Sequence, residues 1–131
     1  MKYYTLKENH LFAKAYRSTK RAGGKYISVY VMPDYHAARL QRAHPLKLRI
    51  NRVGISVTKK LGVAVKRNRV KRIIREAYYK ALKTYDMKTG RIIVIAARTA
   101  AVYAKTDDIY RDLAAALIQL GVASEKQGTE G

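Results

Sequence analysis

Alternation of side-chain types predicts a first strand over residues 26–32. Ile27, Val29 and Val31 share one face, and the intervening positions carry a different set of side chains, namely Tyr26, Ser28, Tyr30 and Met32. A period of two residues is typical of a β-strand. Pro33 ends the pattern, since proline cannot donate to a sheet ladder.

Two further segments predict strands. Residues 47–58 also alternate, but the apolar phase shifts between Ile50 and Val53, which indicates a bulge or a strand split near residue 51. Residues 91–98, RIIVIAAR, form an almost continuous apolar run. Such a run is typical of a central strand that is covered on both faces.

Three segments have helical periodicity. The longest, residues 67–85, has apolar side chains at positions i, i+3, i+4 and i+7, namely Val70, Ile73, Ile74, Ala77, Tyr78, Ala81, Leu82 and Tyr85. Residues 6–16 predict a short helix with Asn9 as a candidate N-cap. Residues 107–120 predict a last helix, capped by Thr106 or Asp107 and ended by Gly121.

This order of elements predicts an α+β fold. Helix, strand, strand, helix, strand and helix follow one another in residues 1–121, with a possible extra strand split near residue 51. One sheet with helices on one face would bury these patterns, which gives a two-layer α/β sandwich. We expect a single domain over residues 1–121 and a disordered tail over residues 122–131, VASEKQGTEG.

The positive charge is distributed unevenly along the chain. The 131 residues carry a formal net charge of +19. Residues 1–83 hold 22 lysines and arginines against three acids, whereas residues 84–131 hold six of each. Charge kept for solubility needs no such asymmetry. A polyanionic partner explains it better.

Composition also narrows the class of protein. There is no cysteine, so disulfides and thiolate metal sites are excluded. No segment approaches the ~20 apolar residues of a membrane span, and MKYYTLKENH lacks the apolar core of a signal peptide. We therefore expect a cytoplasmic protein with no membrane partner.

The sequence offers no convincing catalytic group. His10, His36 and His44 lack metal-ligand spacing, and the few acids in the basic part argue against a two-metal nuclease. The GGK motif at residues 23–25 lacks the other positions of a phosphate-binding P-loop. We predict no catalytic residue and no metal site in the protein itself.

The start of the longest helix carries charge of the wrong sign for a helix. Residues 66–75 read KRNRVKRIIR, although the macrodipole favours acids in the first turn. A helix N-terminus binds anions, and arginine forks suit phosphates. An ordinary solvated face would instead mix acids with bases, and Glu76 is the only acid in residues 59–85. The pattern therefore predicts binding to a phosphate backbone.

Residues 52–78, RVGISVTKKLGVAVKRNRVKRIIREAY, closely resemble the signature of the bacterial ribonuclease P protein component. That signature is approximately S-V-S-K-K, then G-N-A-V, R-N-R, K-R and R-E-A-F/Y. The segments LKENHLFAKAY, KYISVYV and RIIVIAAR are similar to the family's first helix, first strand and last strand, so the resemblance extends nearly to Leu120. Val63 stands where the family commonly has Asn, and the connection over residues 33–51 is longer than expected.

The resemblance implies a function and a fold. The protein would be the small subunit of a ribonucleoprotein endonuclease that removes the 5′ leader of precursor tRNA. Catalysis and Mg²⁺ would belong to the RNA subunit, and no DNA partner is expected. The implied fold is a ribosomal-protein-like sandwich with a left-handed βαβ crossover, which periodicity alone could not predict because such crossovers are rare. The residues expected to contact the catalytic RNA are Lys59, Lys60, Lys66, Arg67, Asn68, Arg69, Lys71, Arg72 and Arg75.

The resemblance also implies a cleft for the single-stranded leader, between the first helix and the sheet. Phe12 and Tyr16 are i, i+4 neighbours on one helix face, and aromatic rings beside cations are typical of single-strand binding. The expected cleft residues are Phe12, Tyr16, Lys25, Tyr26 and Tyr30. The alternative for these rings is ordinary core packing.

Two other functions share some of these features. A structural ribosomal protein would have the same charge and architecture but no need of a leader cleft. A protein-only nuclease would cleave without an RNA subunit, although the scarcity of carboxylates argues against it.

Overall fold

The structure is a computed structural model that describes residues 3–18, 20–35, 39 and 51–126. Its centre is a five-stranded mixed sheet in the order β1-β4-β6-β3-β2. β1, β4 and β6 are mutually parallel, whereas β3 runs antiparallel to β6 and to β2. The strand bounds are β1 Tyr3–Thr5, β2 Arg21–Gly23, β3 Ile27–Pro33, β4 Asn51–Ser56 and β6 Arg91–Ala97.

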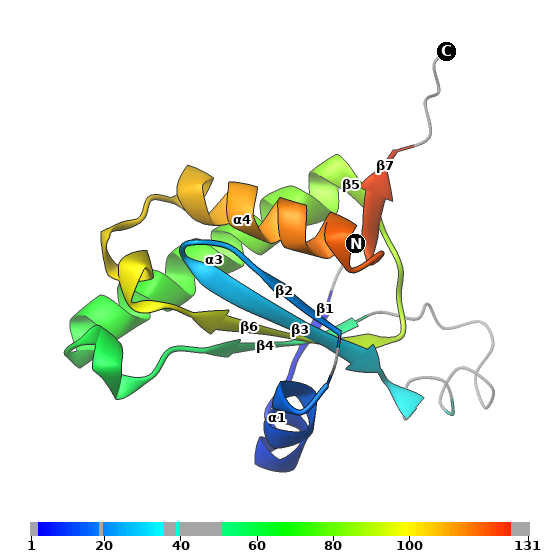
Figure 1. Cartoon of the computed structure of the whole chain (residues 1–131), viewed down its shortest axis with the longest axis horizontal. Helices are drawn as coiled ribbons and strands as arrows, with labels where there is room; N and C mark the ends of the chain where they lie inside the picture. The colour runs from blue at the N-terminus through cyan, green and yellow to red at the C-terminus, as the bar shows by residue number, and fades with distance from the viewer. Residues whose placement is uncertain (1–2, 19, 36–38, 40–50, 127–131) are drawn as a thin grey trace.

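Helices cover both faces of this sheet (Figure 1). They are α1 Asn9–Tyr16, α3 Ala64–Thr84 and α4 Thr106–Gln119, with short 3₁₀ turns η1 Lys59–Leu61 and η2 Thr99–Tyr103. α3 and α4 pack against each other on one face, and α1 lies on the other. A separate two-stranded sheet pairs β5 Tyr85–Met87 with β7 Ala123–Glu125.

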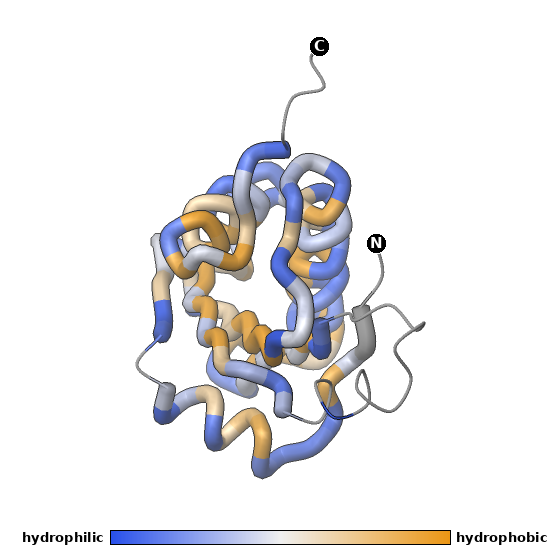
Figure 2. Tube along the Cα trace, turned by 90° about the vertical axis from the view of Figure 1, so that its right-hand side faces the viewer, coloured by the Kyte–Doolittle hydropathy of each residue, from blue (hydrophilic) through white to orange (hydrophobic). Residues whose placement is uncertain are grey.

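The alternation of the strands sorts the core into two clusters. Ile27, Val29 and Val31 lie beside Ile93 and Ile95 in the larger cluster, beneath α3 and α4. The positions between them contribute to a smaller cluster beneath α1, made of Leu6, Ala15, Met32, Ile92 and Val94. Figure 2 shows the hydrophobic (orange) positions concentrated in the strands between the two sets of helices. The expectation that all helices cover one face is therefore wrong for α1, which buries its own apolar side chains against the opposite face.

The α+β class and the main elements are confirmed, with shifted ends. α3 begins at Ala64, three residues before its predicted start, and its buried stripe runs from Val70 to Leu82. Tyr85, predicted as the last member of the stripe, instead begins β5 and is half-buried. The N-cap of α1 is Glu8 rather than Asn9, and that of α4 is Lys105, whose backbone N–H donates to Asp108 Oδ2 at 2.9 Å.

β4 pairs with β6 in continuous register from Arg52 to Ser56, so no bulge occurs in that part. The earlier part of the predicted strand, residues 47–50, lies outside the described residues, as do His36, Arg42 and His44. β4 and β6 are parallel neighbours joined through α3, which is the expected βαβ crossover. Its left-handedness stays a prediction.

The boundary predicted for the disordered tail is too early. Residues 123–125 form β7, and Val122 and Ala123 are buried against the larger cluster. Lys88 N donates to Val122 O at 2.8 Å and continues this attachment. The segment ASE has no apolar alternation that would predict a strand, and its partner β5 lies about 40 positions earlier in the chain. Residues 127–131 lie outside the described part.

Candidate nucleic-acid interface

The N-terminal end of α3 has no acid and no side-chain cap. Its first turn contains no acidic residue, and its N-cap Val63 makes no side-chain hydrogen bond. The preceding turn η1 exposes Lys59 and Lys60, and it ends at Gly62, whose φ of +119° favours glycine. The free N–H groups and partial positive charge of this helix end therefore open onto solvent among lysines.

Basic side chains continue along α3 from this end. Lys66, Asn68, Arg72 and Arg75 are exposed, and Arg67 and Lys71 are half-buried. Among the described residues no carboxylate forms an ion pair with any of these cations. Lys80 contrasts with them, since its Nζ lies 3.1 Å from Asp107 Oδ1. The predicted phosphate-binding residues thus carry charge that the protein does not neutralise in its described part.

Arg69 has a different environment from the other arginines of α3. Its Nη1 donates to Val102 O at 3.1 Å and its Nη2 donates to Ala104 O at 2.9 Å. The guanidinium therefore attaches η2 to α3 by two carbonyls. Direct contact of Arg69 with RNA stays a prediction, whereas this internal role is observed.

Three of the predicted cleft residues come together on the face that carries α1. The rings of Tyr16 and Tyr30 meet edge to face, with centroids 5.1 Å apart and planes at 87°. Phe12 is half-buried against the smaller cluster. A Cβ added to Gly54 would clash with the Phe12 ring, so glycine on β4 is what lets this ring lie on the sheet.

A polar pocket of about 390 Å³ continues this surface beyond Tyr30. It is lined by Arg21, Ala22, Gly23, Ser28, Tyr30 and Arg98. Arg21 and Tyr30 are cross-strand partners, as are Gly23 and Ser28. Sequence reasoning missed Arg21, Ser28 and Arg98 as site residues. The alternation of Ser28 with Tyr30 was a usable signal, whereas Arg21 depends on β2, which no pattern predicted.

Lys25 and Tyr26 do not join these rings. Tyr26 precedes β3, packs against the larger cluster, and donates its backbone N–H to Asp112 Oδ2 at 2.7 Å. Lys25 Nζ lies 5.4 Å from the centroid of the Tyr26 ring. The prediction that Tyr26 shares a face with Tyr30 is wrong, because the alternating strand begins only at Ile27. A role of either residue in RNA binding stays a prediction.

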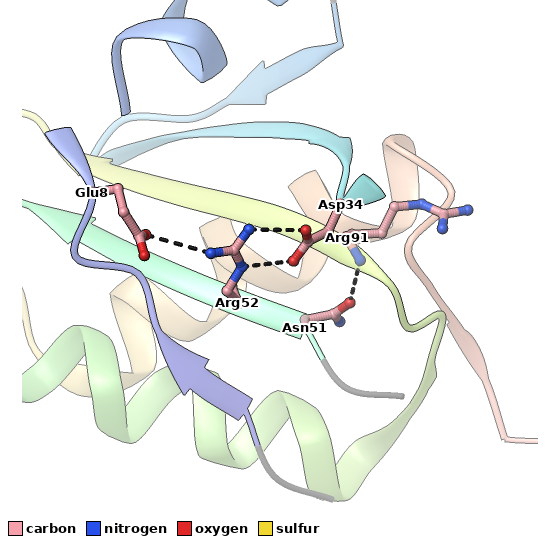
Figure 3. Close-up of polar contacts among 5 residues, drawn as sticks. All are labelled: Glu8, Asp34, Asn51, Arg52 and Arg91. Atoms are coloured by element: carbon pink, nitrogen blue, oxygen red, sulfur yellow. Dashed lines mark hydrogen bonds and ion pairs between the residues drawn. The ribbon is translucent and has the colours of Figure 1, made fainter. Parts of the chain in front are cut away.

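A buried ion pair fixes the sheet beside the start of α1 (Figure 3). Arg52 binds Asp34 with both Nε and Nη2, at 2.7 and 2.9 Å, and its Nη1 lies 3.4 Å from Glu8 Oε2. The hydrogen bond to Asp34 raises the pKa of Arg52. A hydrogen bond to its own backbone, and next the charge of Arg52, lower the pKa of Glu8. Because Glu8 is the N-cap of α1, the network links that helix to β4.

Asn51 completes this arrangement at the start of β4. Its Oδ1 accepts from Arg91 N and its Nδ2 donates to Lys88 O, both at 2.9 Å (Figure 3 draws the first). The buried amide thereby satisfies backbone groups at the entry to β6, next to the Arg52 pair.

Within the described ranges, no three His, Cys, Asp or Glu side chains gather closely enough to hold a metal ion. None of the helices in that part is long and apolar enough to cross a membrane.

Comparisons with known proteins give a consistent result. A family model described as Ribonuclease P matches residues 1–121. The ribonuclease P protein component of Clostridium botulinum (strain Loch Maree / Type A3) is 35% identical over 120 residues, covering 92% of this chain and 93% of that protein. The same component of Staphylococcus carnosus is 40% identical over 95 residues, covering 72% of this chain and 71% of that protein.

A solved structure supports the same comparison. The RNase P protein of Staphylococcus aureus aligns with a TM-score of 0.71 at 28% identity, covering 92% of this chain and 98% of that chain. The family match spans every element from β1 to α4.

Proposed function

Because this chain belongs to the ribonuclease P protein family, whose role is the 5′ maturation of tRNA, we propose that its two surfaces serve two RNAs. The basic end of α3 binds the catalytic RNA subunit, and the α1 face binds the 5′ leader of precursor tRNA. As in other bacterial members, the complex acts in the cytoplasm.

The observation that carries this proposal is the unneutralised charge along α3. Arg67, Arg72 and Arg75 have no carboxylate partner among the described residues, and the first turn of the helix has no acid. Such an arrangement is unfavourable in isolation, since like charges repel and oppose the helix dipole. A phosphate backbone next to this helix end would offset both the repulsion between the cations and their unfavourable interaction with the helix dipole. Binding then releases counterions and becomes strongly dependent on salt.

The α1 face supplies what a single strand needs. Tyr16 is 38% exposed and meets Tyr30, so flat apolar rings are available to unpaired bases. Arg21 and Arg98 line the adjoining pocket and are positioned for leader phosphates. In this proposal the RNA subunit holds Mg²⁺ and performs the cleavage, and the protein supplies binding surfaces alone.

Reconstitution tests the proposal. Precursor tRNA is incubated at low Mg²⁺ with the RNase P RNA alone, the protein alone, and both together. We expect correct 5′ cleavage only with both components. Equal cleavage with and without the protein would contradict a functional subunit, and cleavage by the protein alone would indicate a protein-only nuclease.

A further inference from the structure

We propose that Tyr103 is a stacking platform for an unpaired base of the RNase P RNA and that Arg69 is the residue that positions it. The inference rests on the proposed function, because it takes the RNA subunit as the partner at this end of α3. It adds a contact outside the basic helix and the α1 face.

Tyr103 is the most exposed large hydrophobic residue in the described part, with 87% of its surface accessible. Its neighbours point inward, since Ala104 is fully buried and Val102 packs against the larger cluster. None of the described side chains stacks on Tyr103 or hydrogen-bonds its hydroxyl. The backbone of η2 is thus fixed while the ring itself is left in solvent.

Arg69 donates two hydrogen bonds to the backbone on either side of Tyr103 in the sequence. The acceptors are the carbonyls of Val102 and Ala104, the residues before and after Tyr103. One forked guanidinium therefore fixes the backbone that carries the tyrosine. A preorganised ring loses little conformational entropy when a partner stacks on it.

The surroundings of the ring favour a nucleic acid over an apolar protein partner. η2 contacts η1, with exposed Lys59 and Lys60, and the start of α3 (Figure 1). Lys105, which follows η2, is exposed as well. A ring among cations is the combination that holds an unpaired base and its phosphates.

Three carboxylates near η2 each make a contact within the protein. Asp108 accepts a hydrogen bond from the backbone of Lys105, and Asp107 pairs with Lys80. Glu76 accepts a hydrogen bond from Thr106 Oγ1 at 3.0 Å. Of these three acids only Asp107 is paired with a cation in the described part of the structure, and the lysines and arginines of η1 and of the first turns of α3 outnumber them.

Equilibrium binding of the full chain to its RNase P RNA tests the platform. Tyr103→Ala should weaken binding by about 5- to 150-fold, the equivalent of ~1–3 kcal/mol per stacked base. The dependence on salt should stay unchanged, because no phosphate contact is lost. Tyr103→Phe should restore most of the affinity. Tyr35→Ala is the matched control, since Tyr35 is 69% exposed and follows β3, whose end lies across the molecule from η2 (Figure 1).

Arg69→Ala tests the positioning role. It should weaken binding without changing the salt dependence, and the double variant with Tyr103→Ala should be no weaker than the weaker single variant. An additive loss, with a salt slope lowered by about one, would mean that Arg69 contacts a phosphate directly and would overturn this role. If Arg69→Ala fails to fold by circular dichroism, the three tyrosine variants still decide the stacking claim.

A photoreactive phenylalanine at position 103 identifies the partner in the reconstituted complex. We expect crosslinks to an unpaired nucleotide of the RNA subunit and none from position 35. Crosslinks to precursor tRNA, or to neither RNA, would overturn the assignment. If the unmodified protein binds no RNase P RNA, both proposals fail. If it binds and Tyr103→Ala matches Tyr35→Ala, only the stacking inference fails.

Discussion

Replacing Arg72 and Arg75 by alanine should lower the salt dependence of RNA binding. Both side chains are exposed on α3, and neither has a carboxylate partner in the described part of the chain. On the proposed function, each substitution should therefore remove a phosphate contact without releasing an internal partner. Surface changes of this kind usually alter the free energy of unfolding by less than ~0.5 kcal/mol, so the effect on binding can be measured in a folded protein.

The magnitude follows from counterion release. With ~6 phosphate contacts and a slope of about −0.9 per contact, affinity falls ~2,000-fold between 50 and 200 mM salt. Removing two contacts leaves four, so the same change in salt should weaken the double variant only ~150-fold. The affinity at 50 mM salt should also be lower than that of the unmodified protein.

Titration of the RNase P RNA at several salt concentrations measures both quantities. Arg111→Ala with Lys126→Ala is the matched control, because both side chains are exposed on other elements and the loss of charge is the same. An unchanged slope in the α3 variant, or an equal drop in the control, would refute the assignment of this surface. General loss of positive charge would then be sufficient to explain the data.

Three further predictions concern the α1 face and its support. Tyr30→Ala should weaken binding of precursor tRNA about 5- to 150-fold and leave binding of mature tRNA unchanged; an equal loss for both would contradict the cleft. Gly54→Ala should place a methyl group against Phe12 and destabilise the fold by ~1–3 kcal/mol, which lowers the Tm. An unchanged Tm would show that the Phe12 ring can move aside without strain. Asp34→Ala should leave Arg52 without its bidentate partner and lower the free energy of unfolding by ~3 kcal/mol. A decrease below ~1 kcal/mol, which is typical of a surface ion pair, would mean that water replaces the carboxylate.

Local periodicity predicted the helices and strands better than it predicted how they pack against one another. The stripe on α3 was predictable because burial on a helix repeats every turn, and the structure buries Val70, Ile74 and Ala77 as the pattern requires. No such pattern states which face of a sheet a helix covers. The position of α1 therefore came only from the structure, or from the resemblance that placed a cleft there.

The features of the site that the sequence did not predict depend mainly on polar contacts between residues far apart in the chain. Arg69 looked identical to its neighbours in sequence, but its acceptors lie 33 and 35 positions away. Arg52 meets Asp34 across a connection that the sequence showed only as polar and basic. Tyr26 was misplaced by one residue at a strand end, where alternation stops applying. In each case the missing information is a tertiary neighbour rather than a residue type.

The small cluster beneath α1 gives this helix a looser attachment than the rest of the molecule. Few apolar side chains hold it, whereas α3 and α4 share the extensive core on the opposite face. Segments with little buried contact open locally at lower free energy than the whole domain. We therefore expect α1, which carries Phe12 and Tyr16, to open locally more often than α3. Such opening would allow the proposed groove to accept leaders of different sequences. Amide exchange in α1 should be faster than in α3 and should slow when a leader fills the groove.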